Sequence, residues 1–199
     1  MFVEQKIWGI DFGSKLAGTT VVAYEAGGKV CFRASVKKQD ADQMIVSLAA
    51  ELSPELIGID APLSLPGVFT GRPGFEDYFY RQCDKFTKAM SPMFLGGLTA
   101  RAIKLAAGLE TAGTKLIEVY PVKAGVDMEL KQYGYRSKGP DVEKIIDQLI
   151  ATSGLEPELT PDRLTGHHID AWLALIITKN QAAGKARQAG DAAEGLIYF

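Results

Sequence analysis

Three aspartates in this chain directly follow an isoleucine, and their residue type suits metal chemistry. Asp11 ends the apolar run in WGIDFG, Asp60 ends the run in IGIDAP, and Asp170 lies within HHIDAW. One such aspartate usually caps a helix or opens a turn. Three carboxylates held together repel one another, and a divalent cation removes that repulsion. Oxygen-only ligands favour Mg²⁺ or Mn²⁺, two of which can activate water and stabilise the leaving oxygen of a phosphodiester.

Two further side chains are candidates for the same catalytic set. His167 lies three residues before Asp170, so both residues share one helix face. His167 could be a metal ligand or a proton carrier, and the alternative is an ordinary histidine on the helix surface. The next residue, His168, is expected to point away from this face. Glu118 in LIEVYP lies within a predicted strand. Its side chain either points toward the same edge, faces solvent, or pairs with Arg101.

The elements that must position these residues follow from the apolar pattern. The predicted strands are residues 6–13, 18–26, 29–36, 56–60 and 115–121. The first three form an antiparallel meander, and the later two follow helical crossovers, so they run parallel. The fold class is therefore α/β, with a mixed five-stranded sheet flanked by helices. The strands that end at Asp11 and Asp60 are expected to be parallel neighbours, so their ends meet at one edge of the sheet. At the end of the chain, EGLIYF is either a last strand or an extended tail.

The helical pattern places Asp170 on a face that can approach the sheet closely. The predicted helices are residues 42–52 capped by Asp40 or Asp42, about 75–89, 98–113 capped by Thr99, 139–154, and about 162 or 166 to 183. One face of the last helix is small and partly polar, and it carries His167, Asp170, Ala171, Ala174 and Thr178. Because an aspartate flanked by apolar residues in mid-helix is poorly explained as a cap, we expect Asp170 to reach the sheet edge.

Residues 62–97 differ from the rest of the chain and form a predicted aromatic-rich helical insertion. The aromatic residues there are Phe69, Phe75, Tyr78, Phe79, Tyr80, Phe86 and Phe94. Basic residues are interleaved with them, which would suit a lid that stacks bases and binds phosphate. The alternative is an insertion that packs its own small core, and this is the interpretation we favour because aromatic residues are more often core.

Composition limits the class of protein. The 199 residues are 47% hydrophobic, which predicts a single domain over 1–199 with a sizeable core. Cys31 and Cys83 form no CxxC pair, so a zinc site is poorly supported. We find no signal-peptide pattern and no apolar stretch long enough for a bilayer, and we expect a soluble, cytoplasmic protein without membrane contact. The net charge of −2 neither supports nor excludes nucleic acid.

Several motifs in order resemble a known family. GIDFGSKLAGTTVV is similar to the first strand and hairpin of the ribonuclease H-like superfamily, which includes RuvC-type and YqgF-type Holliday-junction resolvases. LIGIDAPLSLP, YRQCD, SPMFLGGLTARA, IEVYP and HHIDAWLALIIT together resemble an uncharacterised family of predicted nucleases with this fold. The resemblance covers nearly the whole chain.

The resemblance implies metal ligands at Asp11, Asp60 and Asp170. In RuvC-type enzymes the last helix carries two acidic ligands three residues apart, and here His167 replaces the earlier one. The strand-four ligand of those enzymes is usually glutamate, so Asp60 has a shorter arm that could shift a metal position. The implied activity is two-metal hydrolysis of nucleic-acid phosphodiesters.

Three basic residues are candidates for substrate binding. The family pattern places Arg81, Cys83 and Asp84 of YRQCD near the site, where Arg81 would hold a phosphate and Cys83 packs. Lys15 would reach a backbone phosphate beside Asp11, or is solvated, and Arg101 is the third candidate. The substrate that the resemblance implies is nucleic acid, either DNA or RNA, and the oligomeric state is left open.

Two rival functions belong to other classes. An ATP- or phosphate-binding protein of the actin-like superfold would use DFGSKLAGT, but it needs a second domain and a second glycine-rich hairpin. A catalytically inactive binding or scaffold domain would keep the fold and lose turnover. The intact set of three aspartates argues against that rival.

Overall fold

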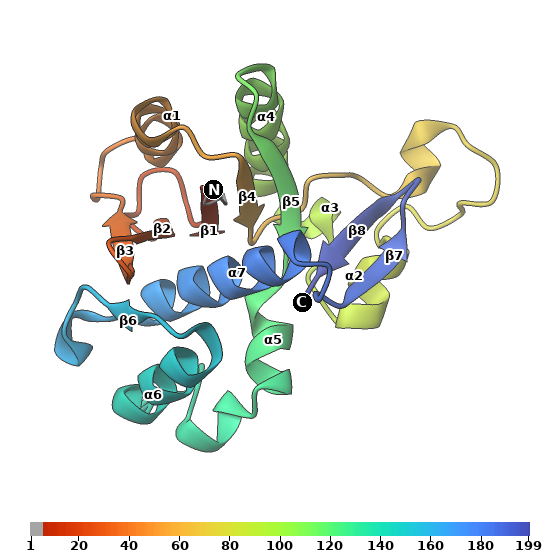
Figure 1. Ribbon diagram of the computed structural model, residues 1–199. Helices are drawn as coiled ribbons and strands as arrows, with labels where there is room; N and C mark the ends of the chain where they lie inside the picture. The colour runs from red at the N-terminus through yellow and green to blue at the C-terminus, as the bar shows by residue number, and fades with distance from the viewer. Residues whose placement is uncertain (1–5) are drawn as a thin grey trace.

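The computed structural model describes residues 6–199 and shows a mixed α/β fold built on one twisted sheet (Figure 1). The strand order is β6-β3-β2-β1-β4-β5-β8-β7. The strands are β1 (Ile7–Asp11), β2 (Val21–Ala26), β3 (Lys29–Ala34), β4 (Leu56–Ile59), β5 (Lys115–Val119), β6 (Glu156–Pro157), β7 (Gln188–Asp191) and β8 (Gly195–Tyr198).

Helices cover both faces of the sheet, with α1 and α4 on one side and α5, α6 and α7 on the other (Figure 1). The α-helices are α1 (Ala41–Leu52), α2 (Gln82–Thr87), α3 (Pro92–Leu95), α4 (Gly97–Thr111), α5 (Pro121–Asp127), α6 (Val142–Ser153) and α7 (Gly166–Ala182). Three 3₁₀ turns are η1 (Gly67–Thr70), η2 (Leu130–Tyr133) and η3 (Pro161–Arg163). Within residues 6–199 no helix combines the length and apolar character that crossing a bilayer requires.

The central five strands have the predicted order and directions, but the predicted strand count is wrong. β2 runs antiparallel to β1 and β3, while β1, β4 and β5 run parallel. Eight strands, not five, make the sheet of residues 6–199. β6 has two residues, and QAGD of β7 shows no apolar alternation, so neither carries a sequence signal. EGLIYF does contain a strand, β8, which pairs with β5.

Helix ends follow local capping chemistry in most cases. The Asp40 side chain accepts hydrogen bonds from the first turn of α1, as predicted, and Asp141 caps α6 in the same way. The predicted cap of α4 is wrong because Gly96 is its N-cap residue. Thr99 lies inside α4, and its hydroxyl donates to the carbonyl of Pro92 in α3. The predicted helix over 75–89 shortens to the six residues of α2.

Alternation along β1 and β4 sends different residues to the two faces of the sheet. Trp8, Ile10, Ile57 and Ile59 pack in the core under α1 and α4. Gly9 and Gly58, in the same strands, face α7 instead. The isoleucine of each Gly-Ile-Asp triplet therefore anchors one core, and the glycine and aspartate that flank it point to the opposite face.

Gly9 and Gly58 allow α7 to lie directly on the sheet. A Cβ atom added at Gly9 would come within 2.0 Å of the Leu175 backbone nitrogen, and one at Gly58 within 1.8 Å of Thr178 Oγ1. The α7 face that makes this contact includes Ala171 and Ala174, whose small side chains permit the approach. Ile169 through Thr178 are all buried, since α5 and α6 cover the other side of α7.

We predict that Gly9→Ala destabilises the protein by about 3 kcal/mol, the upper end for overpacking, because the clash is with backbone and no rotamer relieves it. Urea unfolding monitored by circular dichroism measures this change. Gly108→Ala is the matched control: Gly108 lies in α4 with open space around it, and alanine there should stabilise by about 0.5–1 kcal/mol. A loss below about 1 kcal/mol at Gly9 would contradict the tight packing.

Candidate active site

Asp11 and Asp60 lie side by side at the carboxyl ends of two parallel strands. Asp11 is the last residue of β1, and Asp60 follows β4 directly. The register pairs Ile10 with Ile59, and the Asp60 backbone N–H donates to the Ile10 carbonyl at 2.9 Å. Since both aspartates lie two residues beyond the glycines that face α7, both carboxylates belong to the α7 side of the sheet.

The first turns of α7 bring His167 and Asp170 to this edge, as the sequence predicts. His167 Nδ1 lies 2.7 Å from Asp11 Oδ2, and the histidine ring is about half exposed. Asp170, one turn further along, is buried. The structure therefore gathers the three aspartates and His167 from strands and a helix that are far apart in sequence.

Two residues that sequence reasoning missed hold Asp170 in place. The Tyr135 hydroxyl donates to Asp170 Oδ1 at 2.5 Å, and Arg136 Nη1 lies 3.3 Å from Asp170 Oδ2. Tyr135 is buried, and burial followed by the nearby Asp170 charge raises its pKa, so that it remains a donor. Both residues lie in YGYRSKGP. Nothing in this aromatic–arginine pair among glycines indicates that it lies close to residue 170.

Burial and mutual repulsion make the carboxylates reluctant to ionise. Desolvation raises the pKa of Asp60 well above its usual range, and the charges of Asp11 and Asp170 raise it further. Burial likewise raises the pKa of Asp170 to about 6, although Tyr135 and Arg136 oppose that shift. The hydrogen bond to Asp11 raises the pKa of His167. Asp60 and Asp170 are therefore carboxyl groups whose charged form is disfavoured first by burial and then by nearby negative charge.

A cavity of about 440 Å³ opens beside Asp11 and Asp60 and is also lined by Arg136 and Met90. That volume lies within the range of small-ligand sites. A second cavity is lined by Asp11, Arg136, His167 and Asp170. Among the hydrogen bonds of residues 6–199, none involves the Asp60 carboxylate, whose oxygens therefore remain available to a ligand.

The carboxylates do not converge on one ligand position in this arrangement. Across residues 6–199, no group of three or more His, Cys, Asp and Glu side chains is spaced to hold a metal ion. The contacts above give the physical reason: Asp11 is turned to His167, and Asp170 is turned to Tyr135 and Arg136. The residue types fit Mg²⁺ or Mn²⁺, but binding requires these side chains to exchange partners.

Glu118 points to the predicted edge but is not free there. It lines the cavity beside Asp60, yet its carboxylate accepts from Arg81 Nη1 at 2.7 Å, Arg81 Nη2 at 2.6 Å and the Leu63 backbone N–H at 3.0 Å. The suggested partner Arg101 lies elsewhere. Because Leu63 follows Asp60 closely in the chain, Glu118 fixes the segment that leads away from Asp60.

Arg81 lies in a fully buried ion-pair network. Its guanidinium also donates to Asp84 and Ser64, and its side chain has no exposed surface for a phosphate. Removing either carboxylate partner would leave this buried charge uncompensated and would destabilise the fold. The neighbouring Cys83 is buried and packs in the interior, as predicted. Burial raises the pKa of its thiol to about 12.

Lys15 and Arg101 lie near the loop after Asp11, and each is paired with a carboxylate. Lys15 Nζ contacts Asp40 at 3.0 Å on the surface. Arg101 binds Asp42 through Nε and Nη2 and donates from Nη1 to the Gly13 carbonyl. Arg101 therefore fixes the loop that follows Asp11.

His168 does not reach the carboxylates, as expected. Its Nδ1 takes part in capping α7 with Thr165, and its ring packs edge-on against Phe32. The two adjacent histidines thus have different surroundings, and only His167 contacts Asp11.

The aromatic residues of the 62–97 segment do not form the small core that we favoured. None of the seven is buried, and Phe79 and Phe94 are 53% and 62% exposed. Their rings stack with centroids 5.7 Å apart, and Tyr80 packs edge-on against Phe94. Polar contacts and a small apolar cluster hold this segment, since Glu194 accepts from the backbone of Gly67 and Gln82 and Cys83 packs against strand β7.

Two solved structures are similar to this chain at low identity. RuvC of Thermus thermophilus is 19% identical over 94% of this chain and 99% of its own, with a TM-score of 0.46. The yeast mitochondrial Holliday junction resolvase Ydc2 is 12% identical over 87% of this chain and 76% of its own, with a TM-score of 0.43. No protein-family model and no curated protein sequence matches the chain.

The raised pKa of Asp170 predicts a stability that falls as pH increases in the absence of metal. An acid whose pKa moves from 3.8 to about 6 on folding favours the folded state below pH 4, and it loses that contribution as pH rises to about 6. The loss is about 3 kcal/mol from this residue. Urea unfolding in chelator at pH 4 to 7 measures it.

Asp170→Asn should remove that part of the slope, because asparagine carries no proton equilibrium. Asp147→Asn, at an exposed position in α6, is the control and should leave the slope unchanged. Equal slopes in Asp170→Asn and wild type would show that Asp170 titrates normally.

Proposed function

We propose that this protein is a metal-dependent nuclease of ribonuclease H-like fold that hydrolyses phosphodiester bonds of nucleic acid. The observation that supports the proposal is the gathering of Asp11, Asp60 and Asp170 at one edge of the sheet, with His167 beside them. Carboxylates that disfavour each other's ionisation are stabilised most directly by divalent cations. The Asp60 oxygens, which accept no protein hydrogen bond among the described residues, are suited to this role.

The residues have distinct proposed roles. Asp11, Asp60 and Asp170 would hold Mg²⁺ or Mn²⁺, ions that can activate a water and stabilise a leaving oxygen of a phosphodiester. Asp11 orients the His167 ring through Nδ1, so Nε2 is the nitrogen positioned to accept or give a proton. Glu118 and Arg81 position the segment after Asp60. Arg101 positions the loop after Asp11.

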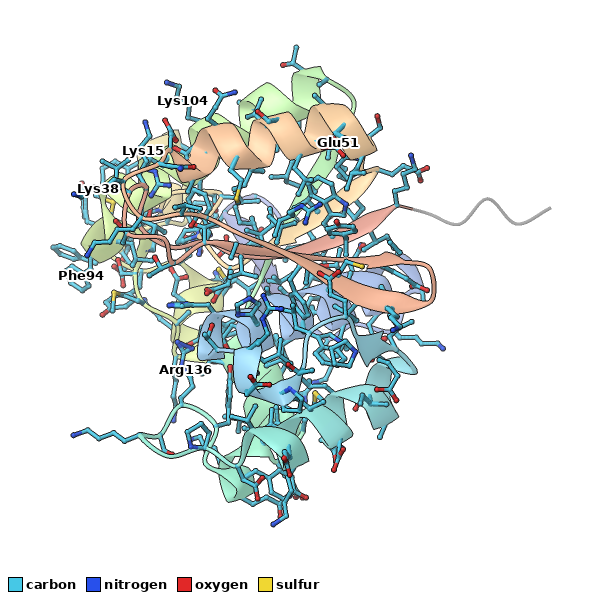
Figure 2. All side chains as sticks on the ribbon, turned by 90° about the vertical axis from the view of Figure 1, so that its left-hand side faces the viewer. Lys15, Lys38, Glu51, Phe94, Lys104 and Arg136 are labelled. Atoms are coloured by element: carbon cyan, nitrogen blue, oxygen red, sulfur yellow. The ribbon has the colours of Figure 1, made fainter. Side chains whose placement is uncertain are left out.

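The surface around the cavity suits a strand of nucleic acid. Lys15, Lys38, Phe94 and Arg136 lie toward the same side of the molecule (Figure 2). Met90 connects the 62–97 segment to the cavity that contains Asp11 and Asp60. Exposed rings beside positive charges can stack on bases while the charges contact phosphates. We propose that this side binds substrate.

A metal titration tests the proposal directly. We expect wild-type protein to bind Mn²⁺ with millimolar or tighter affinity, measured by calorimetry with and without a phosphodiester oligonucleotide. Asp11→Asn and Asp60→Asn should each weaken binding at least about tenfold, a cost of about 1.4 kcal/mol or more. Each variant should also lose Mn²⁺-dependent cleavage of labelled DNA and RNA.

Asp147→Asn is again the matched control, because Asp147 is an exposed carboxylate in α6. It should bind Mn²⁺ as wild type does. Mn²⁺ binding without cleavage of any nucleic acid would favour an inactive binding domain. Absence of Mn²⁺ binding even with oligonucleotide present would refute the proposed metal site.

A second prediction concerns the exposed rings. The double substitution Phe79→Ala and Phe94→Ala should weaken binding of a single-stranded oligonucleotide about 5- to 100-fold, since stacking contributes roughly 1–3 kcal/mol per base. Fluorescence anisotropy with Ca²⁺ in place of Mn²⁺ measures binding without turnover. Phe86→Ala is the control, because Phe86 is 63% exposed but lies against Phe199 rather than the Phe79–Phe94 pair. Equal losses in both proteins would contradict a specific stacking role.

A further inference from the structure

Arg136 has an unusual backbone and an unusual position. Its φ angle is 62°, in the left-handed region that residues other than glycine rarely adopt. Such conformations persist where surrounding contacts demand them. The side chain is 49% exposed, so burial of the arginine itself does not explain the strain. The remaining source of the constraint is the set of contacts that its guanidinium makes.

The guanidinium lies at the boundary between the two cavities of the site. Arg136 lines the cavity with Asp11 and Asp60, and it also lines the cavity with His167 and Asp170. Nη1 lies 3.3 Å from Asp170 Oδ2, a loose and non-bidentate contact. The arginine thus faces all three carboxylates and is fixed tightly to none.

A divalent cation and this guanidinium compete for the same charge. A metal bound by Asp170 together with Asp11 or Asp60 would place two positive charges beside a third, within a few ångströms and partly shielded from water. Asp170 Oδ1 is occupied by Tyr135, so Oδ2 is the oxygen that both cations would use. The exposed side of Arg136 gives it room to move away.

We propose that Arg136 is a built-in counter-ion of the carboxylate cluster, which neutralises the cluster when no metal is bound and is displaced from Asp170 when a divalent cation enters. The inference rests on the proposed metal site but not on nuclease turnover. It agrees with the side-chain contacts, because Arg136 and Tyr135 hold Asp170 away from a shared ligand position with Asp11 and Asp60 in this arrangement.

The test is the Mn²⁺ affinity of Arg136→Gln, measured by calorimetry without substrate. Removing the competing charge should tighten binding about tenfold or more, given the strength of charge repulsion at this range. Arg136→Lys retains the charge and should stay within about threefold of wild type. Arg33→Gln, an exposed arginine on β3, is the matched control and should leave the affinity unchanged.

A second readout is thermal stability. In chelator, Arg136→Gln should melt below wild type, and saturating Mn²⁺ should raise its melting temperature by more than it raises that of wild type. A tighter Mn²⁺ affinity in Arg136→Gln but not in Arg136→Lys supports the proposal. An equal or weaker affinity in Arg136→Gln, or the same tightening in both variants, overturns it while the metal site stands. Absence of Mn²⁺ binding in every protein overturns both.

A measurement on wild-type protein covers the case in which Arg136→Gln does not fold. The side-chain Nε–H resonance of Arg136, assigned from its absence in Arg136→Lys, should shift toward the free-arginine position as Mg²⁺ is added. A resonance that stays at its metal-free position while Mg²⁺ saturates the site would show that the ion pair with Asp170 persists, and the proposal would be wrong.

Discussion

The close contact between α7 and the sheet is the constraint on which the rest of this structure depends. Gly9 and Gly58 remove the side chains that would otherwise hold the helix away, and the small residues of α7 fill the space. Because each glycine precedes its aspartate by two residues, the same face of the sheet carries both the contact and the carboxylates. Packing and site geometry are therefore set by one pattern, Gly-Ile-Asp, used in two neighbouring strands.

That packing imposes an electrostatic cost. It buries Asp170 and partly buries Asp60 near Asp11, and desolvation followed by the nearby negative charge raises the pKa of Asp60 and Asp170. The protein offsets part of this cost with Tyr135, Arg136 and His167, all of which contact a carboxylate of the cluster. Three partners from two different segments of the chain therefore compensate a cluster whose negative charges repel one another.

The 62–97 segment is attached to the sheet by buried ion pairs together with a small apolar cluster of Cys83, Ala189, Ile197 and Phe199. The buried Arg81 joins Glu118 of β5 to Asp84 of α2, and Glu194 joins the β7–β8 turn to Gly67 and Gln82. Paired and hydrogen-bonded ions of this kind specify one geometry, and breaking one pair leaves an uncompensated buried charge. The Phe79 and Phe94 rings take no part in this attachment and stack on each other at the surface.

The sequence by itself determined the central five strands, the length of α7 and the nearness of Asp11, Asp60, His167 and Asp170, because periodicity and strand direction are local properties. Only the tertiary structure decided which partner each charge has. Glu118 pairs with Arg81 rather than Arg101, and Arg136 reaches Asp170, across 37 and 34 residues. It also decided that the aromatic segment faces solvent and that β6 and β7 join the sheet. Strand order and helix faces follow from patterns along the chain, whereas the choice of partner among several charged side chains depends on how the whole molecule packs.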